Sequence, residues 1–476
     1  MEVRNFVDGV LETTVRTLDN VTPGTGEVYG TIPRSGREEV DRAVAAAKRA
    51  FPAWSSTPAA ERAACLERLA DAVRDNAPLL AEAEARDNGK PVSLAAHVDI
   101  PRAEKNLRFY ASGIQHFASQ SHAMEGQAIN YTLRKPLGVV ACISPWNLPL
   151  YLFTWKVAPA LAAGNCVVAK PSELTPATAY LLSTWVEEAG FPPGVFNVLH
   201  GLGPEVGEAM VTHDDIAAVS FTGGTQTGAR IAGHVAPKFK KMSLELGGKN
   251  PAIVFADADF DDALRTTLRS SFANQGQICL CGSRILVERS IYVAFRDALV
   301  AKASKMVAGD PLDPATKMGA VVSENHMNKI LSCIERARDE GGTVLCGGNR
   351  VFPEGGENGF FVAPTVIEGL GPHCATNQEE IFGPVVTLQA FDTEEVALAL
   401  ANDTMYGLAA TLWTTDLKRA HRVAAKIDSG IVWVNTWLLR DLRTPFGGVK
   451  ASGLGREGGF EALEFFTEPQ NICIQL

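Results

Sequence analysis

The strongest constraint on the fold is a series of short, valine-rich apolar segments that alternate with stretches of helical spacing. The apolar segments are Leu137–Ile143, Cys166–Ala169, Phe196–Leu199 and Ala218–Phe221. The helical stretches are Leu150–Ala163, Pro176–Ala189, Gly203–Thr212 and Thr225–Val235. Strand and helix in repetition predict a parallel sheet with right-handed crossovers. We therefore expect an open α/β sheet of the kind that binds nucleotides in this half of the chain.

A second alternation begins at Pro251. Strands are expected at Ile253–Phe255, Arg284–Val287, Thr343–Leu345, Val385–Ala390, Ala410–Trp413 and Ile431–Val434. Helices are expected at Phe260–Ala273, Ile291–Val307, Glu324–Asp339 and Glu394–Ala401. A chain of 476 residues is too long for one compact core. A second α/β domain is therefore expected, and the join falls near Gly247-Gly248.

The N-terminal part is predicted to be helical, and two other segments fit neither sheet. Helices are expected at 37–50, from Thr57-Pro58 through Arg86, and at about 99–117. Ser121–Arg134 is polar with alternating character and predicts a hairpin arm, and Phe465–Leu476 is an extended apolar tail. Such segments often pair across a subunit interface because an exposed strand edge is a liability. The alternative is that both fold back on their own subunit.

Composition narrows the range of partners. Lys+Arg 44 against Asp+Glu 54 gives a net charge of -10, which argues against a nucleic-acid binder. No apolar run is long enough to span a bilayer, and the first residues lack the pattern of a secretory signal. The nine cysteines lack zinc spacing, so we expect reduced thiols in a cytoplasmic protein and no metal site.

The segment Asn274-Gln-Gly-Gln-Ile-Cys279 places a cysteine after a glycine-containing turn that follows a predicted helix. Such a turn can present a thiol to a cleft, where a nearby helix end or polar group favours the thiolate. Most free cysteines, however, are buried and inert. This segment alone leaves a catalytic and a structural role equally open.

Two further segments carry candidate catalytic groups. Glu245 lies between Leu244 and Leu246, directly before the glycine pair, and an apolar cleft would raise its pKa toward that of a general base. Asn147 follows a predicted strand and can offer an amide N–H to a developing oxyanion. The alternatives are a surface glutamate at a strand end and an asparagine that only satisfies its turn.

Three strand ends have features of a dinucleotide site. Glu173, in Lys170-Pro-Ser-Glu173, can accept hydrogen bonds from a ribose and would repel a 2′-phosphate, although Lys170 leaves NADP possible. The small residues of Phe221–Gly228 would let a pyrophosphate approach a helix N-terminus. The glycines of Gly201–Gly207 lack a clear fingerprint spacing and favour packing around an adenine. A capped turn before Pro176 is the alternative for the first segment.

Together these segments resemble the aldehyde dehydrogenase superfamily, in the family's order and over nearly the whole chain. The similarity also includes Glu379-Glu-Ile-Phe-Gly-Pro384 and Pro445-Phe-Gly-Gly-Val-Lys450. The resemblance implies a Rossmann-type NAD domain from 1–116 and 138–247, an α/β catalytic domain from 248–445, and an oligomerisation arm and tail from 117–137 and 460–476. It also implies NAD as cofactor and a homo-oligomer, a dimer or a tetramer.

The resemblance assigns roles by position. Cys279 is the expected nucleophile that forms a thiohemiacetal and then a thioester, Asn147 and the Cys279 N–H hold the oxyanion, and Glu245 activates water. Glu380 resembles the residue that holds the nicotinamide ribose, and Phe382 the one that packs beside the ring. The full set of expected cofactor contacts is Ile143, Ser144, Trp146, Lys170, Ser172, Glu173, Gly203, Gly207, Phe221, Thr222, Gly223, Gly224, Thr227, Leu246, Glu380 and Phe382.

The chain departs from the family pattern at two places. Position 224 is glycine where many relatives carry serine, so one hydroxyl contact to the pyrophosphate is missing. Ile278 and Leu280 flank the expected nucleophile where some relatives have cysteines. Neither change affects the expected chemistry.

The loop before Pro445 carries the expectation about substrate. Arg440 and Arg443 in a generally acidic chain suggest a carboxylate site, because a guanidinium matches that group. The run Arg440-Asp-Leu-Arg-Thr-Pro-Phe-Gly-Gly448 resembles the hydroxymuconic and aminomuconic semialdehyde dehydrogenases. That resemblance implies 2-aminomuconate or 2-hydroxymuconate 6-semialdehyde as substrate. The expected substrate residues are Arg102, Trp155, Arg440, Arg443 and Phe446, although Arg443 could instead pair with Asp441 or Glu457 at the surface.

Other functions stay open at this point. The substrate could be another acidic aldehyde, such as 5-carboxymethyl-2-hydroxymuconate semialdehyde. A thiol esterase could use Cys279 with Glu245 and no cofactor, but it leaves Glu173 and Phe221–Gly228 unused. A binding or structural protein on the same fold would be suggested by loss of Cys279, Glu245 or Asn147, and all three are present.

Overall fold

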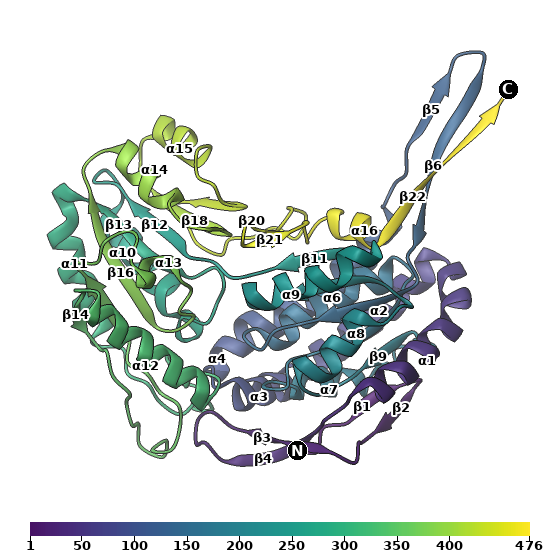
Figure 1. Ribbon diagram of the computed structural model, residues 1–476, viewed down its shortest axis with the longest axis horizontal. Coiled ribbons are helices and arrows are strands. Elements are labelled where there is room, and N and C mark those ends of the chain that lie inside the picture. Colours follow the sequence, from purple (N-terminus) through teal and green to yellow (C-terminus); the bar gives the residue numbers. More distant parts are fainter.

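The computed structural model describes residues 1–476 and contains two open sheets and a projecting arm (Figure 1). The first sheet has the strand order β2-β1-β9-β8-β7-β10-β11-β21, and its strands from β9 to β11 run parallel. Its strands are β1 Asn5–Val7, β2 Val10–Glu12, β7 Val139–Ile143, β8 Cys166–Lys170, β9 Phe196–Val198, β10 Ile216–Thr222, β11 Lys241–Glu245 and β21 Gly453–Leu454. This is the parallel nucleotide-binding type of sheet that the alternation predicts.

Helices cover the first sheet and share with it a core of 63 buried residues. The longer ones are α1 Arg37–Ser56, α2 Ala59–Asp75, α3 Ala77–Asn88, α5 Ile100–Gln115, α6 Pro149–Ala162 and α9 Thr225–Val235, and the shorter ones are α4 Val92–Leu94, α7 Ala177–Ser183, α8 Glu208–Thr212 and α16 Glu461–Phe465. Helix α6 is apolar on nearly all sides, as a helix enclosed by protein requires. It follows β7 and fixes the turn that contains Asn147.

The second sheet has the order β14-β15-β16-β13-β12-β18-β19 and is parallel except for β14. Its strands are β12 Asn250–Val254, β13 Gly282–Glu288, β14 Thr343–Cys346, β15 Thr365–Glu368, β16 Val385–Phe391, β18 Ala409–Trp413 and β19 Ile431–Val434. The helices around it are α10 Phe260–Phe272, α11 Arg289–Ala303, α12 Glu324–Asp339, α13 Ala375–Gln378, α14 Glu394–Asn402 and α15 Leu417–Ala424. The chain leaves the first sheet at Glu245 and enters the second at Asn250, at the predicted join.

The arm is a three-stranded sheet of the order β22-β6-β5 that stands away from the body (Figure 1). Its strands are β5 Ser121–Met124, β6 Ala128–Pro136 and β22 Thr467–Gln475. The tail therefore pairs with the hairpin of its own chain, in register from Thr467 opposite Pro136 to Gln475 opposite Ala128. Apolar side chains on this sheet remain exposed, namely Met124, Ile129, Leu133, Ile474 and Leu476.

The predicted all-helical N-terminal part was wrong in two respects. The first 33 residues form strands: β1 and β2 turn at Asp8-Gly9, and β3 Thr17–Val21 pairs with β4 Val28–Pro33. An Asp-Gly pair between apolar residues is a recognisable hairpin signal that the helical interpretation missed. The helix expected from residue 57 to 86 is interrupted at Asn76, because Pro78 lacks the N–H that would continue it.

Three other segments differ from expectation. Strands β11 and β15 were not predicted, since each is only four or five residues long. Residues 176–189 form a regular helix only over α7, and turns follow to Gly190. No helix in the structure combines the length and the hydropathy needed to cross a membrane.

The core of the second sheet gives a stability prediction. Phe295 of α11 is fully buried against this sheet, whereas Val293 on the same helix is 57% exposed. Phe295→Ala should lower the free energy of unfolding by about 3–5 kcal/mol, because it leaves a cavity as well as losing apolar burial. Val293→Ala, the control, should change it by less than about 0.5 kcal/mol. Calorimetric unfolding midpoints compare the two, and equal midpoints would contradict this packing.

Candidate active site

Cys279 lies on a loop between α10 and β13 whose backbone is tightly specified. Asn274 and Gln275 adopt left-handed conformations, with φ of 51° and 56°, and Gly276 follows at 70°. Asn250 of β12 donates from Nδ2 to the carbonyl oxygens of Cys279, at 2.6 Å, and Cys281, at 2.9 Å. Asn250 thus holds the main chain at Cys279 and at Cys281, and the thiol is presented by a backbone that the second sheet anchors.

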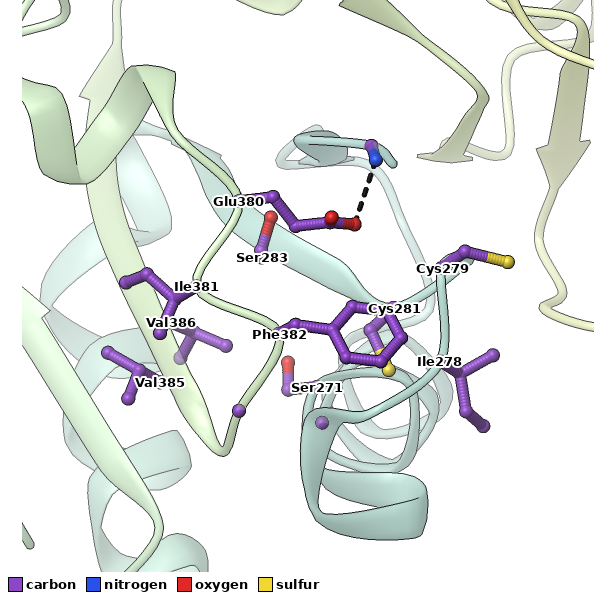
Figure 2. Close-up of a pocket in the computed structure, with 13 residues that line it drawn as sticks. Ser271, Ile278, Cys279, Cys281, Ser283, Glu380, Ile381, Phe382, Val385 and Val386 are labelled. Atoms are coloured by element: carbon purple, nitrogen blue, oxygen red, sulfur yellow. Dashed lines mark hydrogen bonds between the residues drawn. The ribbon is translucent and has the colours of Figure 1, made fainter. Parts of the chain in front are cut away.

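Cys279 is partly exposed and lies in an anionic environment. Burial, with the charges of Glu380 and Glu245, raises the pKa of its thiol above the ordinary value. Figure 2 shows that the sulfurs of Cys279 and Cys281 point in different directions from the loop. A neighbouring base is therefore needed to take the proton from Cys279 at neutral pH.

Asn147 reaches this loop from the first sheet. It lies in the turn between β7 and α6, is 3% exposed, and donates from Nδ2 to the carbonyl oxygen of Gln277 at 3.0 Å. An amide nitrogen carries two N–H groups, so one remains available. Asn147 and Cys279 line the same cavity, which gives that N–H access to an oxygen bound beside the thiol.

Glu245 ends β11 and is 3% exposed, and neither of its carboxylate oxygens has a hydrogen-bond partner. Its pKa is raised well above the ordinary value, first by burial and then by the negative charge of Glu457. Glu457 itself is held by Lys156, at 2.7 Å, and by Ser220, at 2.9 Å. A buried carboxylate without a fixed partner is suited to accepting a proton.

The central cavity joins the two sheets and measures about 230 Å³. Besides Asn147 and Cys279 it is lined by expected cofactor residues from both sheets: Trp146, Thr222, Gly223, Gly224, Leu246, Glu380 and Phe382. Glu380 accepts a hydrogen bond from the Gly248 N–H at 2.9 Å, the dashed line in Figure 2. The tertiary fold thus brings together groups as far apart in the sequence as Trp146 and Phe382.

A second cavity of about 320 Å³ lies at the carboxyl ends of the first sheet's strands. Its lining includes six more of the expected cofactor residues: Ile143, Glu173, Gly203, Gly207, Phe221 and Thr227. Three expected residues lie beside the cavities rather than in their lining. Lys170 pairs with Glu173 at 3.0 Å, Ser172 accepts a hydrogen bond from the Leu174 N–H, and Ser144 is buried. The bond of Ser172 agrees with the capped-turn alternative.

Three hydroxyl groups in or next to these cavities have no hydrogen-bond partner within the chain. They are the buried side-chain oxygens of Ser144, Thr222 and Thr225. Thr225 begins α9, whose N-cap Gly224 has no side chain, so the first N–H groups of that helix remain accessible. These donors fit the hydroxyl and phosphate oxygens of a dinucleotide.

A third cavity, of about 200 Å³, is basic. Arg102 of α5 and Arg440 line it together with His97, Lys105 and Tyr151. Arg440 lies over the rings of Phe446, at 4.0 Å from the centroid, and Trp155, at 5.1 Å. Arg102 lies over Trp155 at 5.8 Å. Neither arginine forms a salt bridge with a carboxylate of the chain, so both guanidinium groups are free to bind a carboxylate from outside.

Arg443 does not join this cavity. It pairs with Asp441 at 2.6 Å, and its side chain is 81% exposed. The structure therefore shows the surface ion pair that was left open as the alternative, with Asp441 as the partner. The reason is local: Asp441 also caps the turn by accepting from the Arg443 N–H at 2.9 Å, which holds both side chains at the surface.

Several residues around the site were not singled out from the sequence. His326 and Lys329 of α12 line the central cavity, and His326 bonds the Phe382 carbonyl at 2.8 Å. Asn250 anchors the Cys279 loop, and the Tyr151 hydroxyl oxygen accepts a hydrogen bond from Arg440 Nη1 at 3.2 Å. None of these carries a local signal, because each acts only through a neighbour distant in the sequence.

Comparison with known proteins places the chain in a family. The model of the aldehyde dehydrogenase family matches residues 10–472. The chain belongs to the aldehyde dehydrogenase family. A 2-aminomuconic semialdehyde dehydrogenase of Bos taurus is 50% identical over 99% of this chain and 98% of its own. A 2-hydroxymuconic semialdehyde dehydrogenase of Pseudomonas sp. (strain CF600) is 48% identical over 100% of both chains.

Solved structures agree with this placement. The NAD+ complex of an aldehyde dehydrogenase from Bacillus cereus superimposes with a TM-score of 0.98 at 39% identity. The superposition covers 100% of this chain and 97% of the other. The predicted aldehyde dehydrogenase fold, with its parallel sheets, is therefore confirmed.

The Cys279 loop supports a prediction about its glycine. A Cβ at Gly276 would lie 2.1 Å from the Gly383 carbonyl oxygen, and φ is already 70°. Gly276→Ala should therefore displace the loop and lower the rate of the first NADH-forming turnover by roughly a hundredfold. Gly233→Ala, in open space within α9, is the control and should leave that rate unchanged. Stopped-flow absorbance measures both, and an unchanged rate in Gly276→Ala would refute this account of the loop.

Proposed function

We propose that this aldehyde dehydrogenase oxidises a semialdehyde that also bears a carboxylate, namely 2-aminomuconate or 2-hydroxymuconate 6-semialdehyde, with NAD as the oxidant. The observation that carries the substrate class is the pair Arg102 and Arg440, two guanidinium groups in one cavity without a carboxylate of the chain. The positive charge of Arg440 also acts to lower the pKa of Cys279 and of Glu245, which supports a role for the basic cavity next to the reacting groups.

The relatives support the same substrate class. Two of them carry the names 2-aminomuconic and 2-hydroxymuconic semialdehyde dehydrogenase and match the full chain. Both substrates have an aldehyde at one end and a carboxylate at the other. A related acidic aldehyde, such as 5-carboxymethyl-2-hydroxymuconate semialdehyde, is the second candidate because it presents the same two groups.

The groups around the two larger cavities support NAD as the cofactor. Glu173 would accept hydrogen bonds from the adenosine ribose, the open N-terminus of α9 would bind the pyrophosphate, and Glu380 would hold the nicotinamide ribose beside Phe382. Lys170 neutralises part of the Glu173 charge, but the carboxylate still favours NAD over NADP. When bound, NAD supplies the acceptor for the hydride that leaves the substrate carbon.

The first half of the reaction is assigned to Cys279, Asn147 and Glu245. The Cys279 sulfur attacks the aldehyde carbon as its proton passes to Glu245, and a carbon–sulfur bond forms while the carbonyl π bond opens. The free N–H of Asn147 and the Cys279 N–H stabilise the oxyanion. Its collapse expels the hydride and leaves a thioester on Cys279.

Glu245 then serves the second half. Once the proton taken from Cys279 has passed to solvent, the Glu245 carboxylate accepts a proton from a water molecule as that water attacks the thioester carbon, and the carbon–sulfur bond breaks to release the carboxylic acid and restore the Cys279 thiolate. Because its oxygens have no fixed partner, Glu245 can turn between the thiol and the water. An esterase that uses the same thiol would need only this half, and it would leave the dinucleotide groups without a role.

We assign the first sheet and its helices to NAD binding, the second to catalysis, and the arm to assembly of a homo-oligomer. The exposed apolar side chains of β5, β6 and β22 support the last assignment, because an isolated sheet of this kind attracts a partner edge. All nine cysteines are free, and the mechanism requires Cys279 as a thiol. A reducing compartment such as the cytoplasm suits that requirement.

The pKa of Glu245 gives a pH prediction. Glu245 acts as a base only above its raised pKa, so turnover should fall as the pH decreases through that value, well above the ordinary 4.5. Glu457→Gln removes a negative charge that raises this pKa, so the acid limb of the kcat profile should move to lower pH. Glu464→Gln, at an exposed carboxylate, should leave the limb in place. A limb that stays fixed in Glu457→Gln would contradict the assignment.

The substrate proposal is tested by the two arginines of one loop. Arg440→Ala should raise KM for the muconic semialdehyde by roughly tenfold to a hundredfold, because it removes a charge-assisted bond to the carboxylate. It should change KM for propanal far less, since propanal has no carboxylate. Arg443→Ala is the matched control and should affect neither. Equal rises for both aldehydes in Arg440→Ala would reject the carboxylate site.

A further inference from the structure

A cluster of charged side chains lies buried behind the site and has no role in the proposed chemistry. Lys90, Glu84 and Asp99 are each 0% exposed. The Lys90 ammonium contacts Asp99 Oδ2 at 2.7 Å, Glu84 Oε1 at 3.4 Å and the main-chain oxygen of Asn147 at 3.0 Å. Burying three ionisable groups costs free energy, so this cost must be offset by the structure that the cluster holds in place.

Lys90 contacts Asn147 at its main-chain carbonyl oxygen. The Asn147 carbonyl oxygen accepts from Lys90 and, at 2.9 Å, from Asn274 Nδ2, while the Asn147 side chain donates to Gln277. Just before Lys90, Asn88 donates to the carbonyl oxygen of Trp146 at 2.8 Å. The end of α3 therefore fixes both residues of the turn that carries the oxyanion amide.

The same cluster reaches the basic cavity. Asp99 ends a π-helical turn, Ala95–Asp99, that runs directly into α5, and Arg102 lies three positions later. Glu84 accepts from the Leu150 N–H at 3.2 Å, at the start of α6. Burial raises the pKa of both Glu84 and Asp99, and Asp99 is the nearer partner of the Lys90 ammonium, at 2.7 Å against 3.4 Å. Lys90 thus links α5 and the Asn147 turn through one ion pair.

We propose that Lys90 is a positioning residue that holds the Asn147 amide against the Cys279 loop and, through Asp99, fixes its spacing from Arg102. The proposal rests on the function assigned to Asn147 and Arg102 above. Lys90 touches neither substrate nor cofactor cavity, and it acts by locking the carbonyl of the residue whose side chain binds the oxyanion. A rigid spacing lets one substrate place its carboxylate on Arg102 and its aldehyde oxygen on Asn147 together.

The test removes the ion pair as a unit. Lys90→Met combined with Asp99→Asn removes the ion pair, and burial raises the pKa of Glu84 to about 8, so that carboxyl can stay neutral in the variant, which favours a folded protein. Its burst rate of NADH formation should fall by at least about tenfold, because a shift of ~1 Å in a catalytic group costs up to roughly a hundredfold in rate. The Kd for NAD, measured by fluorescence, should stay at the wild-type value. That split separates a displaced oxyanion group from general damage.

The matched control is Arg62→Met. Arg62 is also a buried cation that donates to main-chain oxygens, those of Ala162 and Thr57, and it lies outside the site. It should lower the unfolding midpoint while leaving the burst rate unchanged. A folded double variant with a wild-type burst rate would overturn the proposal. If the double variant does not fold, Asp99→Asn alone decides: a reduced burst rate supports the proposal, and an unchanged one overturns it.

Each rate is measured with the muconic semialdehyde and with propanal. If the wild type oxidises propanal but not the semialdehyde, the proposed substrate is wrong, and the role of Lys90 is then judged on propanal alone. With both substrates accepted, the double variant should lose rate on both, because both use Asn147. Its loss should be larger for the semialdehyde, which also depends on the spacing to Arg102.

Discussion

A pair of reciprocal hydrogen bonds between the two sheets is the constraint on which the rest of the site depends. Asn147, from the first sheet, donates to Gln277 on the Cys279 loop, and Asn274 of that loop donates back to the Asn147 carbonyl oxygen. The two left-handed residues that start the loop would be strained in isolation. The contact across the join therefore holds the thiol and the oxyanion amide in one geometry.

The electrostatics of the site follow from burial on both sides of this contact. Burial, and then the negative charge of Glu457, raises the pKa of Glu245 and makes its carboxylate a stronger base, so acidic groups dominate this side of the contact. The basic cavity instead has an excess of positive charge, since Arg102 and Arg440 are surrounded by aromatic rings and not by carboxylates. A substrate with a carboxylate at one end and an aldehyde at the other suits both sides: the arginines attract its carboxylate, and Cys279 and Glu245 act on its aldehyde.

The sequence predicted the regular, buried elements better than the short or exposed ones. Strand β7 and helix α12 agree closely with expectation, because a run of valines or a full amphipathic helix is a strong local pattern. Strands β1–β4 were missed, since each gains its stability from a partner strand rather than from its own spacing. Arg443 was left open for a similar reason, as only the fold decides which side of a loop faces a cavity.

The sequence by itself determined the chemical groups and their order: a thiol at Cys279, a carboxylate at Glu245, an amide at Asn147 and a parallel-sheet framework to carry them. Tertiary structure alone decided which groups meet. It brought Lys90 and Asn274 to the carbonyl of Asn147, paired Arg443 with Asp441, and left Arg440 free over Phe446. The physical reason is that these contacts join segments far apart in the chain, so their geometry depends on how the two sheets pack rather than on local pattern.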